Sequence, residues 1–313
     1  MARIDFHVHV ITPRYGETLP PFPRPPQALD GYRRFMERYE VDAAVLSMGG
    51  ALEAGSLSAA RTGNEELAEV VRAEPQRFGA LAILPFTSAA PDAAAAEAAY
   101  ALDHLGLDGV ALFSNHAGTY LGDPAWDVVF AELDRRGAYA FVHPATPPTG
   151  LVLPHYPRWL FEYPFDTTRA LANLIYSGAL ERYPHVRLQF AHLGGTSLFL
   201  AHRLASLADR EPEKAALAPA GVLQYLRRQY YDTGLSNNTV ALASALEATT
   251  LDRVVFGSDW PYLAQPPGND PSDDFARLDP ADRARIDAGN ARALVPRLAA
   301  GLAASGGQAD AGG

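Results

Sequence analysis

Residues 3–10 read Arg3-Ile4-Asp5-Phe6-His7-Val8-His9-Val10, in which polar and apolar side chains alternate strictly. Alternation with a period of two is typical of a β-strand, whose successive side chains point to opposite faces. Asp5, His7 and His9 are therefore expected on one face, and the apolar residues, Phe6 among them, on the other. No glycine-rich phosphate turn follows this strand, which argues against a doubly wound dinucleotide-binding sheet.

The rest of the chain repeats this strand signal, with helical periodicity between the repeats. The eight strand candidates span residues 4–10, 43–48, 79–85, 109–114, 138–143, 186–192, 230–234 and 253–258. The helical candidates span residues 29–38, 64–73, 92–105, 125–136, 168–182, 196–207 and 239–248. Eight strand–helix repeats predict an α/β fold, a single-domain (β/α)8 TIM barrel. The barrel is expected to cover residues 1–300, and residues 301–313 to form a flexible C-terminal tail.

Composition limits the chemistry. The 313 residues include 26 basic and 36 acidic side chains, a net charge of −10, which argues against a nucleic-acid partner. The absence of cysteine excludes disulfides, thiolate nucleophiles and cysteine-bound zinc, so that any metal must be held by histidine and carboxylate groups. Lys214, the single lysine, lies in a charged stretch, which argues against Schiff-base chemistry. No signal-peptide core or membrane-spanning run is present, and we expect a cytoplasmic protein without a membrane partner.

Polar residues stand where four of the predicted strands end. His7 and His9 lie two apart near the end of the first strand, close enough to chelate one divalent cation. The fifth strand closes on His143, the sixth on His192 and the eighth on Asp259. Each could instead be structural, as a hydrogen-bonded histidine or a helix cap. Because the carboxyl ends of barrel strands meet at one mouth, the five together favour a single site.

Two loops after strand ends are longer than barrel connections require. The first spans residues 12–27 and is rich in proline, and the second spans residues 144–164 and is rich in aromatic side chains. A stiff surface connection is the simple interpretation of either loop. The position of the second loop favours an aromatic wall at the barrel mouth. Replacement of Trp159 would test whether this wall exists.

On these residues the chain resembles the amidohydrolase superfamily, in particular the decarboxylase branch around aminocarboxymuconate-semialdehyde decarboxylase and the hydroxybenzoate decarboxylases. The resemblance runs from about Ile4 to Leu263. Its most specific part, residues 162–170, is similar to the segment after strand five in 6-methylsalicylate decarboxylase-like members. The other supporting stretches are residues 64–85, His7-Val8-His9, His143-Pro144, His192-Leu193-Gly194-Gly195 and Gly257-Ser258-Asp259-Trp260-Pro261.

The resemblance implies that His7, His9, His143 and Asp259 bind a metal and that His192 is a nearby acid/base. The two-metal members use a carbamylated lysine at the end of strand four, where this chain has Leu112-Phe113-Ser114-Asn115-His116. One divalent metal ion is therefore expected, with Zn²⁺ favoured and Mn²⁺ as the alternative.

The resemblance also implies a metal-dependent, non-oxidative decarboxylase of an aromatic carboxylic acid with an ortho hydroxyl group. Either Asp259 or a metal-bound water with His192 delivers the proton. Arg203 would reach the substrate of the partner across a homodimer, and Arg24 would bind the carboxylate in its own subunit. Trp159 and Phe165 are the aromatic substrate-binding candidates. The rival hypotheses are a metal-dependent hydrolase of a lactone or amide and a barrel that only binds.

Overall fold

Eight parallel strands form the centre of the molecule. The computed structural model describes residues 2–19, 27–48, 56–150, 153–262 and 278–301. Neighbouring strands pair in the order β1-β2-β3-β4-β7-β8-β9-β10. The strands are β1 (Ile4–His9), β2 (Ala43–Ser47), β3 (Phe78–Ile83), β4 (Gly109–Phe113), β7 (Tyr139–His143), β8 (Arg187–Phe190), β9 (Tyr230–Asp232) and β10 (Val254–Val255).

Backbone hydrogen bonds join the segment that follows β10 to β1 and close the sheet. The amide of Phe6 donates to the carbonyl of Phe256 at 2.9 Å, and the amide of His9 donates to the carbonyl of Trp260 at 2.9 Å. In return, the amide of Asp259 donates to the carbonyl of His7 at 2.8 Å. The predicted (β/α)8 barrel is confirmed.

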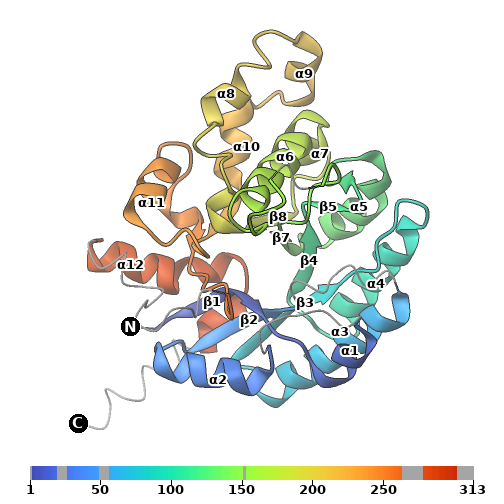
Figure 1. The fold of residues 1–313 in the computed structure, drawn as a ribbon, viewed down its shortest axis with the longest axis vertical. Coiled ribbons are helices and arrows are strands. Elements are labelled where there is room, and N and C mark those ends of the chain that lie inside the picture. The colour runs from blue at the N-terminus through green and yellow to red at the C-terminus, as the bar shows by residue number, and fades with distance from the viewer. Residues whose placement is uncertain (1, 20–26, 49–55, 151–152, 263–277, 302–313) are drawn as a thin grey trace.

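Helices surround this barrel (Figure 1). They include α1 (Pro13–Thr18), α2 (Leu29–Arg38), α3 (Leu57–Ala73), α4 (Pro91–Asp103), α5 (Asp127–Arg135), α6 (Glu162–Tyr176), α7 (Ala179–Arg182), α8 (Ala201–Ala205), α9 (Pro212–Leu217), α10 (Val222–Arg228), α11 (Thr239–Leu246) and α12 (Pro280–Asp287), and residues 296–301 are also helical. A two-stranded hairpin, β5 (Asn115–His116) and β6 (Thr119–Tyr120), follows β4. Short 3-10 helices occur at Pro124–Trp126, His192–Gly194, Leu251–Arg253 and Gly289–Ala293.

All eight predicted strands exist, and each is shorter than expected. The helix expected over residues 196–207 is reduced to α8, Ala201–Ala205. Helix α1 forms inside the loop predicted over residues 12–27, with Pro13 at its first position, where the fixed φ of proline suits a helix. Apart from Gly301, the predicted tail at 301–313 lies outside the described residues.

The strict alternation expected for β1 is wrong in one respect. Its pairing with β2 shifts by one residue between Asp5 and Val8, which marks a β-bulge. The ring of Phe6 consequently contacts Tyr139 of β7, across the barrel, with centroids 6.3 Å apart. Asp5 turns the other way and accepts a hydrogen bond from Tyr32 of the outer helix α2 at 2.9 Å. The bulge lets the consecutive residues Phe6 and His7 both face the interior.

Candidate metal centre

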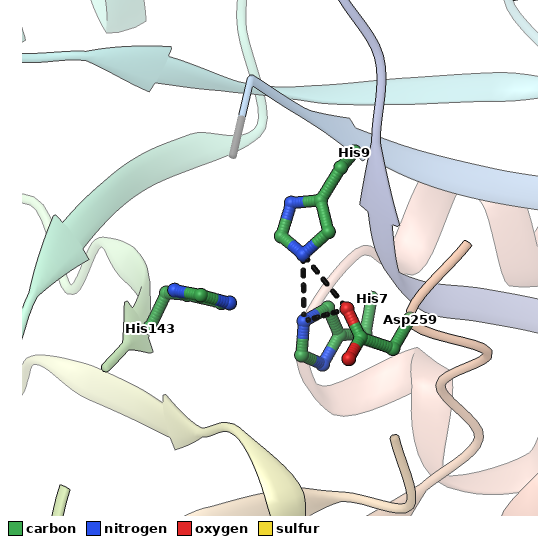
Figure 2. A group of neighbouring side chains, drawn as sticks. All are labelled: His7, His9, His143 and Asp259. Atoms are coloured by element: carbon green, nitrogen blue, oxygen red, sulfur yellow. Dashed lines mark hydrogen bonds and ion pairs between the residues drawn. The ribbon is translucent and has the colours of Figure 1, made fainter. Parts of the chain in front are cut away.

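Four side chains from three parts of the barrel converge at the carboxyl ends of the strands (Figure 2). His7 and His9 belong to β1, His143 is the last residue of β7, and Asp259 follows β10. One potential ligand atom of each residue lies within 4.8 Å of those of the other three, and all four residues are buried. Within the described part of the chain, this is the one group of histidine and acidic residues that could hold a metal.

A buried carboxylate fixes the orientation of His7. Its Nδ1 lies 2.9 Å from Oδ1 of Asp232, at the end of β9. Gln189 on β8 donates to the other oxygen of Asp232 at 2.8 Å. A proton on Nδ1 that is held by Asp232 leaves Nε2 of His7 facing the site, 3.1 Å from Nε2 of His9. Such a carboxylate–histidine pair is the usual support of a metal-binding imidazole.

Asp232 and Gln189 were not predicted as site residues. A signal was present, because the seventh predicted strand also ends on a carboxylate, in Tyr231-Asp232-Thr233-Gly234. Gly234 belongs to the same arrangement, since a Cβ atom there would lie 2.7 Å from Nδ1 of His7. Residue 234 must therefore be a glycine, because the backbone passes too close to the His7 ring for a side chain.

His9 and His143 present neutral nitrogen atoms to the site. Burial lowers the pKa of His9, although Asp259 opposes this effect. Burial, together with the neighbouring His9 and His7, holds the pKa of His143 well below its usual value. Nδ1 of His143 lies 2.8 Å from the carbonyl oxygen of Pro144, and its ring points toward the other two histidines (Figure 2). Neutral imidazole is the form that binds metals.

Asp259 supplies the negative charge. Its Oδ1 lies 3.2 Å from Nε2 of His7 and 2.9 Å from Nε2 of His9. Burial alone would raise the pKa of Asp259, but the charge of His7 and hydrogen bonds from His192, His7 and His9 hold this pKa well below its usual value. Its φ of +57° is in the left-handed region, an uncommon conformation for a residue with a side chain.

His192 lies beside the four residues rather than among them. It follows β8, and its Nε2 lies 3.3 Å from Oδ2 of Asp259. The backbone amide of His192 donates to Asp232 at 3.2 Å, which ties it to the support of His7. His192 and Leu193 both have positive φ, +57° and +51°. The role of His192 as an acid/base outside the ligand set stays a prediction.

The donor set fits a divalent metal ion. Three imidazoles and one carboxylate are a common set for Zn²⁺ and related ions. Burial alone would lower the pKa of His7, yet Asp232 and Asp259 raise it well above its usual value. The site therefore attracts positive charge, and facing imidazole nitrogens 3.1 Å apart require a cation or a proton between them. A metal-binding site at these residues follows from this arrangement.

Of the predicted substrate-binding residues, the structure describes Trp159, Phe165 and Arg203, and all three are exposed. Arg24 lies outside the described residues. Trp159 and Phe165 are 55% and 45% exposed. Arg203 is exposed on the short helix α8.

Two tyrosines that the sequence analysis did not select contact the centre directly. The ring of Tyr163 lies 6.0 Å from that of His143, and the ring of Tyr262 lies 5.5 Å from that of His9, both edge to face. Tyr163 falls within the aromatic loop predicted at 144–164, but the structure places it in the first turn of helix α6, from where its ring reaches His143.

Comparison with known protein families decides the relationship. A family model described as amidohydrolase matches residues 4–297, nearly the whole chain. The chain belongs to the amidohydrolase family. Its predicted place in the decarboxylase branch is also confirmed, because a relative described as 6-methylsalicylic acid decarboxylase, from Penicillium expansum, is 33% identical over 95% of this chain and 97% of its own length.

Solved structures share the fold of this amidohydrolase. One is 2,6-dihydroxybenzoate decarboxylase from Rhizobium, with a TM-score of 0.79, 22% identity and coverage of 95% of this chain and 99% of the other. Another is dihydroxybenzoic acid decarboxylase from Polaromonas sp. JS666, with bound manganese and the inhibitor 2-nitroresorcinol. Its TM-score is 0.75 at 23% identity, with coverage of 94% and 97% of the two chains.

Within the described ranges, no helix combines the length and the apolar character needed to cross a bilayer.

Proposed function

We propose that this amidohydrolase is a metal-dependent, non-oxidative decarboxylase of an aromatic carboxylic acid with a hydroxyl group ortho to the carboxylate. The observation that carries the proposal is the relationship to 6-methylsalicylic acid decarboxylase over nearly the full length of both chains. The buried group of three histidines and Asp259 supplies the chemistry that such a reaction needs. The same comparison favours decarboxylation over hydrolysis of a lactone or amide.

We propose that His7, His9, His143 and Asp259 hold one divalent ion. When bound, such an ion would supply a Lewis acid that orients the carboxylate and ortho-hydroxyl groups of the substrate and withdraws charge from the ring. Three imidazoles favour Zn²⁺, and the bound manganese in the Polaromonas enzyme supports Mn²⁺ as the alternative. Metal analysis of protein purified without chelators would identify the ion.

The protein must deliver one proton to the ring carbon that carries the carboxylate. As the bond from this carbon to the carboxylate breaks, its electron pair returns to the ring and carbon dioxide leaves. His192 and Asp259 are the candidate donors, and the 3.3 Å between Nε2 and Oδ2 allows the pair to share a proton. Tyr163 and Tyr262 border the ligands His143 and His9 with aromatic surface, which suits a planar substrate.

Assay against a panel of hydroxybenzoates and lactones tests this proposal. Release of carbon dioxide from an ortho-hydroxybenzoate, with the corresponding phenol as the other product, is the expected result. Ring-opened acid from a lactone, without carbon dioxide release, would support the hydrolase instead. Binding without turnover of any panel member would support a barrel that only binds.

Trp159→Ala is expected to raise KM for ring substrates about fivefold, the factor that corresponds to about 1 kcal/mol for one aromatic contact. We propose that Trp159 and Phe165 extend the aromatic wall that begins at Tyr163. Steady-state kinetics would measure the change, with Leu217→Ala on α9 as a control for loss of an exposed apolar side chain. An unchanged KM would show that Trp159 is a surface residue that does not contact the substrate.

We further propose a cytoplasmic homodimer in which Arg203 enters the site of the partner, while Arg24 binds the carboxylate in its own subunit. A guanidinium offers two parallel donors to a carboxylate. Phe199, four residues before Arg203, is 77% exposed, and Val240 on α11 is 78% exposed. An apolar side chain exposed to this degree four residues from Arg203 suits a covered surface.

Mixed subunits test this arrangement. Arg203→Ala and His192→Ala are each expected to be inactive alone. After subunit exchange, a hybrid dimer has one site with both residues intact, so activity should return to about a quarter of the wild-type value by random pairing. No recovery after demonstrated exchange, or a fully active monomer, would contradict a shared site.

A further inference from the structure

A buried carboxylate near the start of helix α6 has no role in the chemistry above. Asp166 is fully buried, within the run at 162–170 that the sequence analysis singled out. It accepts hydrogen bonds from the Ser114 hydroxyl, from the Asn115 amide at 2.8 Å and from the Tyr120 hydroxyl at 2.5 Å. The nearest cation, Arg169, is 3.8 Å away and about half exposed. Asp166 thus accepts hydrogen bonds from three residues that follow strand β4.

Two of these donors also hold the loop after strand β7. The hydroxyl oxygen of Ser114 accepts a hydrogen bond from the amide of Ala145 at 2.7 Å. The side-chain amide of Asn115 donates to the carbonyl of Thr146 at 3.1 Å, besides its bond to Asp166. Asp166 is therefore linked to two consecutive residues of this loop: to Ala145 through Ser114, and to Thr146 through Asn115.

This loop segment begins directly after the ligand His143. The Nδ1 atom of His143 lies 2.8 Å from the carbonyl oxygen of Pro144, the residue between His143 and Ala145. The amide of Ser114 donates to the carbonyl of His143 at 2.8 Å. Ser114 thus holds the chain on both sides of Pro144, whose carbonyl sets the direction of the His143 ring.

We propose that Asp166 is a positioning residue for the metal ligand His143, acting through Ser114 and the backbone at Ala145. The inference rests on the metal site proposed above. A carboxylate is suited to the task because its two oxygens accept all three donors at once. Asparagine has nearly the same shape but only one acceptor oxygen, and its amide group would oppose a donor.

Metal titration of the chelator-treated full-length protein tests the role of Asp166. Asp166→Asn is expected to weaken Zn²⁺ binding about 10- to 100-fold, the usual effect of losing a support of a ligand. It should also change the visible absorption of the Co²⁺-loaded protein, which reports coordination geometry. A structural role confined to anchoring α6 would alter the unfolding midpoint and leave both readouts unchanged.

Glu97→Gln is the matched control. Glu97 is also fully buried, and it accepts hydrogen bonds from Arg61 and Asn64 between helices α3 and α4. The substitution makes the same chemical change, from carboxylate to amide, away from the metal ligands. It should lower the unfolding midpoint while leaving Zn²⁺ affinity and the Co²⁺ spectrum as in the wild type.

Ser114→Ala keeps the inference testable if Asp166→Asn does not fold. It removes one hydroxyl and should weaken Zn²⁺ binding in the same direction, whereas Ser114→Thr, which keeps a hydroxyl, should restore it. Where both folded proteins are obtained, the double variant should bind about as weakly as the weaker single variant, because both act through one connection. Wild-type affinity in folded Ser114→Ala or Asp166→Asn would overturn the inference. A wild-type protein that binds no metal would instead overturn the proposed function.

Discussion

His192→Ala is expected to lower kcat by about 10²–10⁴ while leaving one metal ion bound per chain. The reason is the position of His192, whose Nε2 contacts Oδ2 of Asp259 while His192 is not one of the four proposed ligands. The loss of its ring removes a partner for the proton and removes no expected ligand. Steady-state kinetics and elemental analysis of the same preparation would measure the two effects.

His185→Ala is the control for loss of a histidine ring. His185 is exposed and pairs with Asp134 at 3.1 Å, so its replacement should leave kcat and metal content unchanged. Loss of metal together with activity in His192→Ala would contradict the assignment and make His192 a ligand. Full activity in His192→Ala would show that His192 takes no part in the reaction.

His143→Ala is expected to abolish stoichiometric metal binding and, with it, activity. The substitution removes one of four donors, and we expect a loss of affinity larger than the 10- to 100-fold typical of an outer support. Asp232→Asn provides that comparison, because Asp232 contacts the metal site only through His7 and the backbone of His192. In a titration with Zn²⁺, we expect the affinity to be highest for the wild type, lower for Asp232→Asn and lowest for His143→Ala.

Chelation of the wild-type protein completes this test. Activity should disappear on metal removal and return when Zn²⁺ or Mn²⁺ is added back. Full activity in protein that elemental analysis finds free of metal would contradict the metal-dependent mechanism, whatever the behaviour of the variants.

Much of the barrel could be predicted because its signals are local. Strands and helices follow from the periodicity of apolar residues over a few positions, and helix α2 was predicted at its observed bounds, Leu29–Arg38. His7, His9, His143, His192 and Asp259 could be found for a related reason. Parallel barrel strands place their carboxyl ends at one mouth, so polar residues at those ends meet regardless of their separation in the chain.

The sequence by itself determined the eight-strand barrel, the family and the residues that meet at its mouth. Only the tertiary structure decided how these residues are held. The bulge that turns Phe6 and His7 to the same side depends on pairing with β2, Asp232 reaches His7 across 225 positions of sequence, and Asp166 reaches Ser114 across 52. Local periodicity carries no information about such contacts, because they depend on which side chains oppose each other once the barrel has closed.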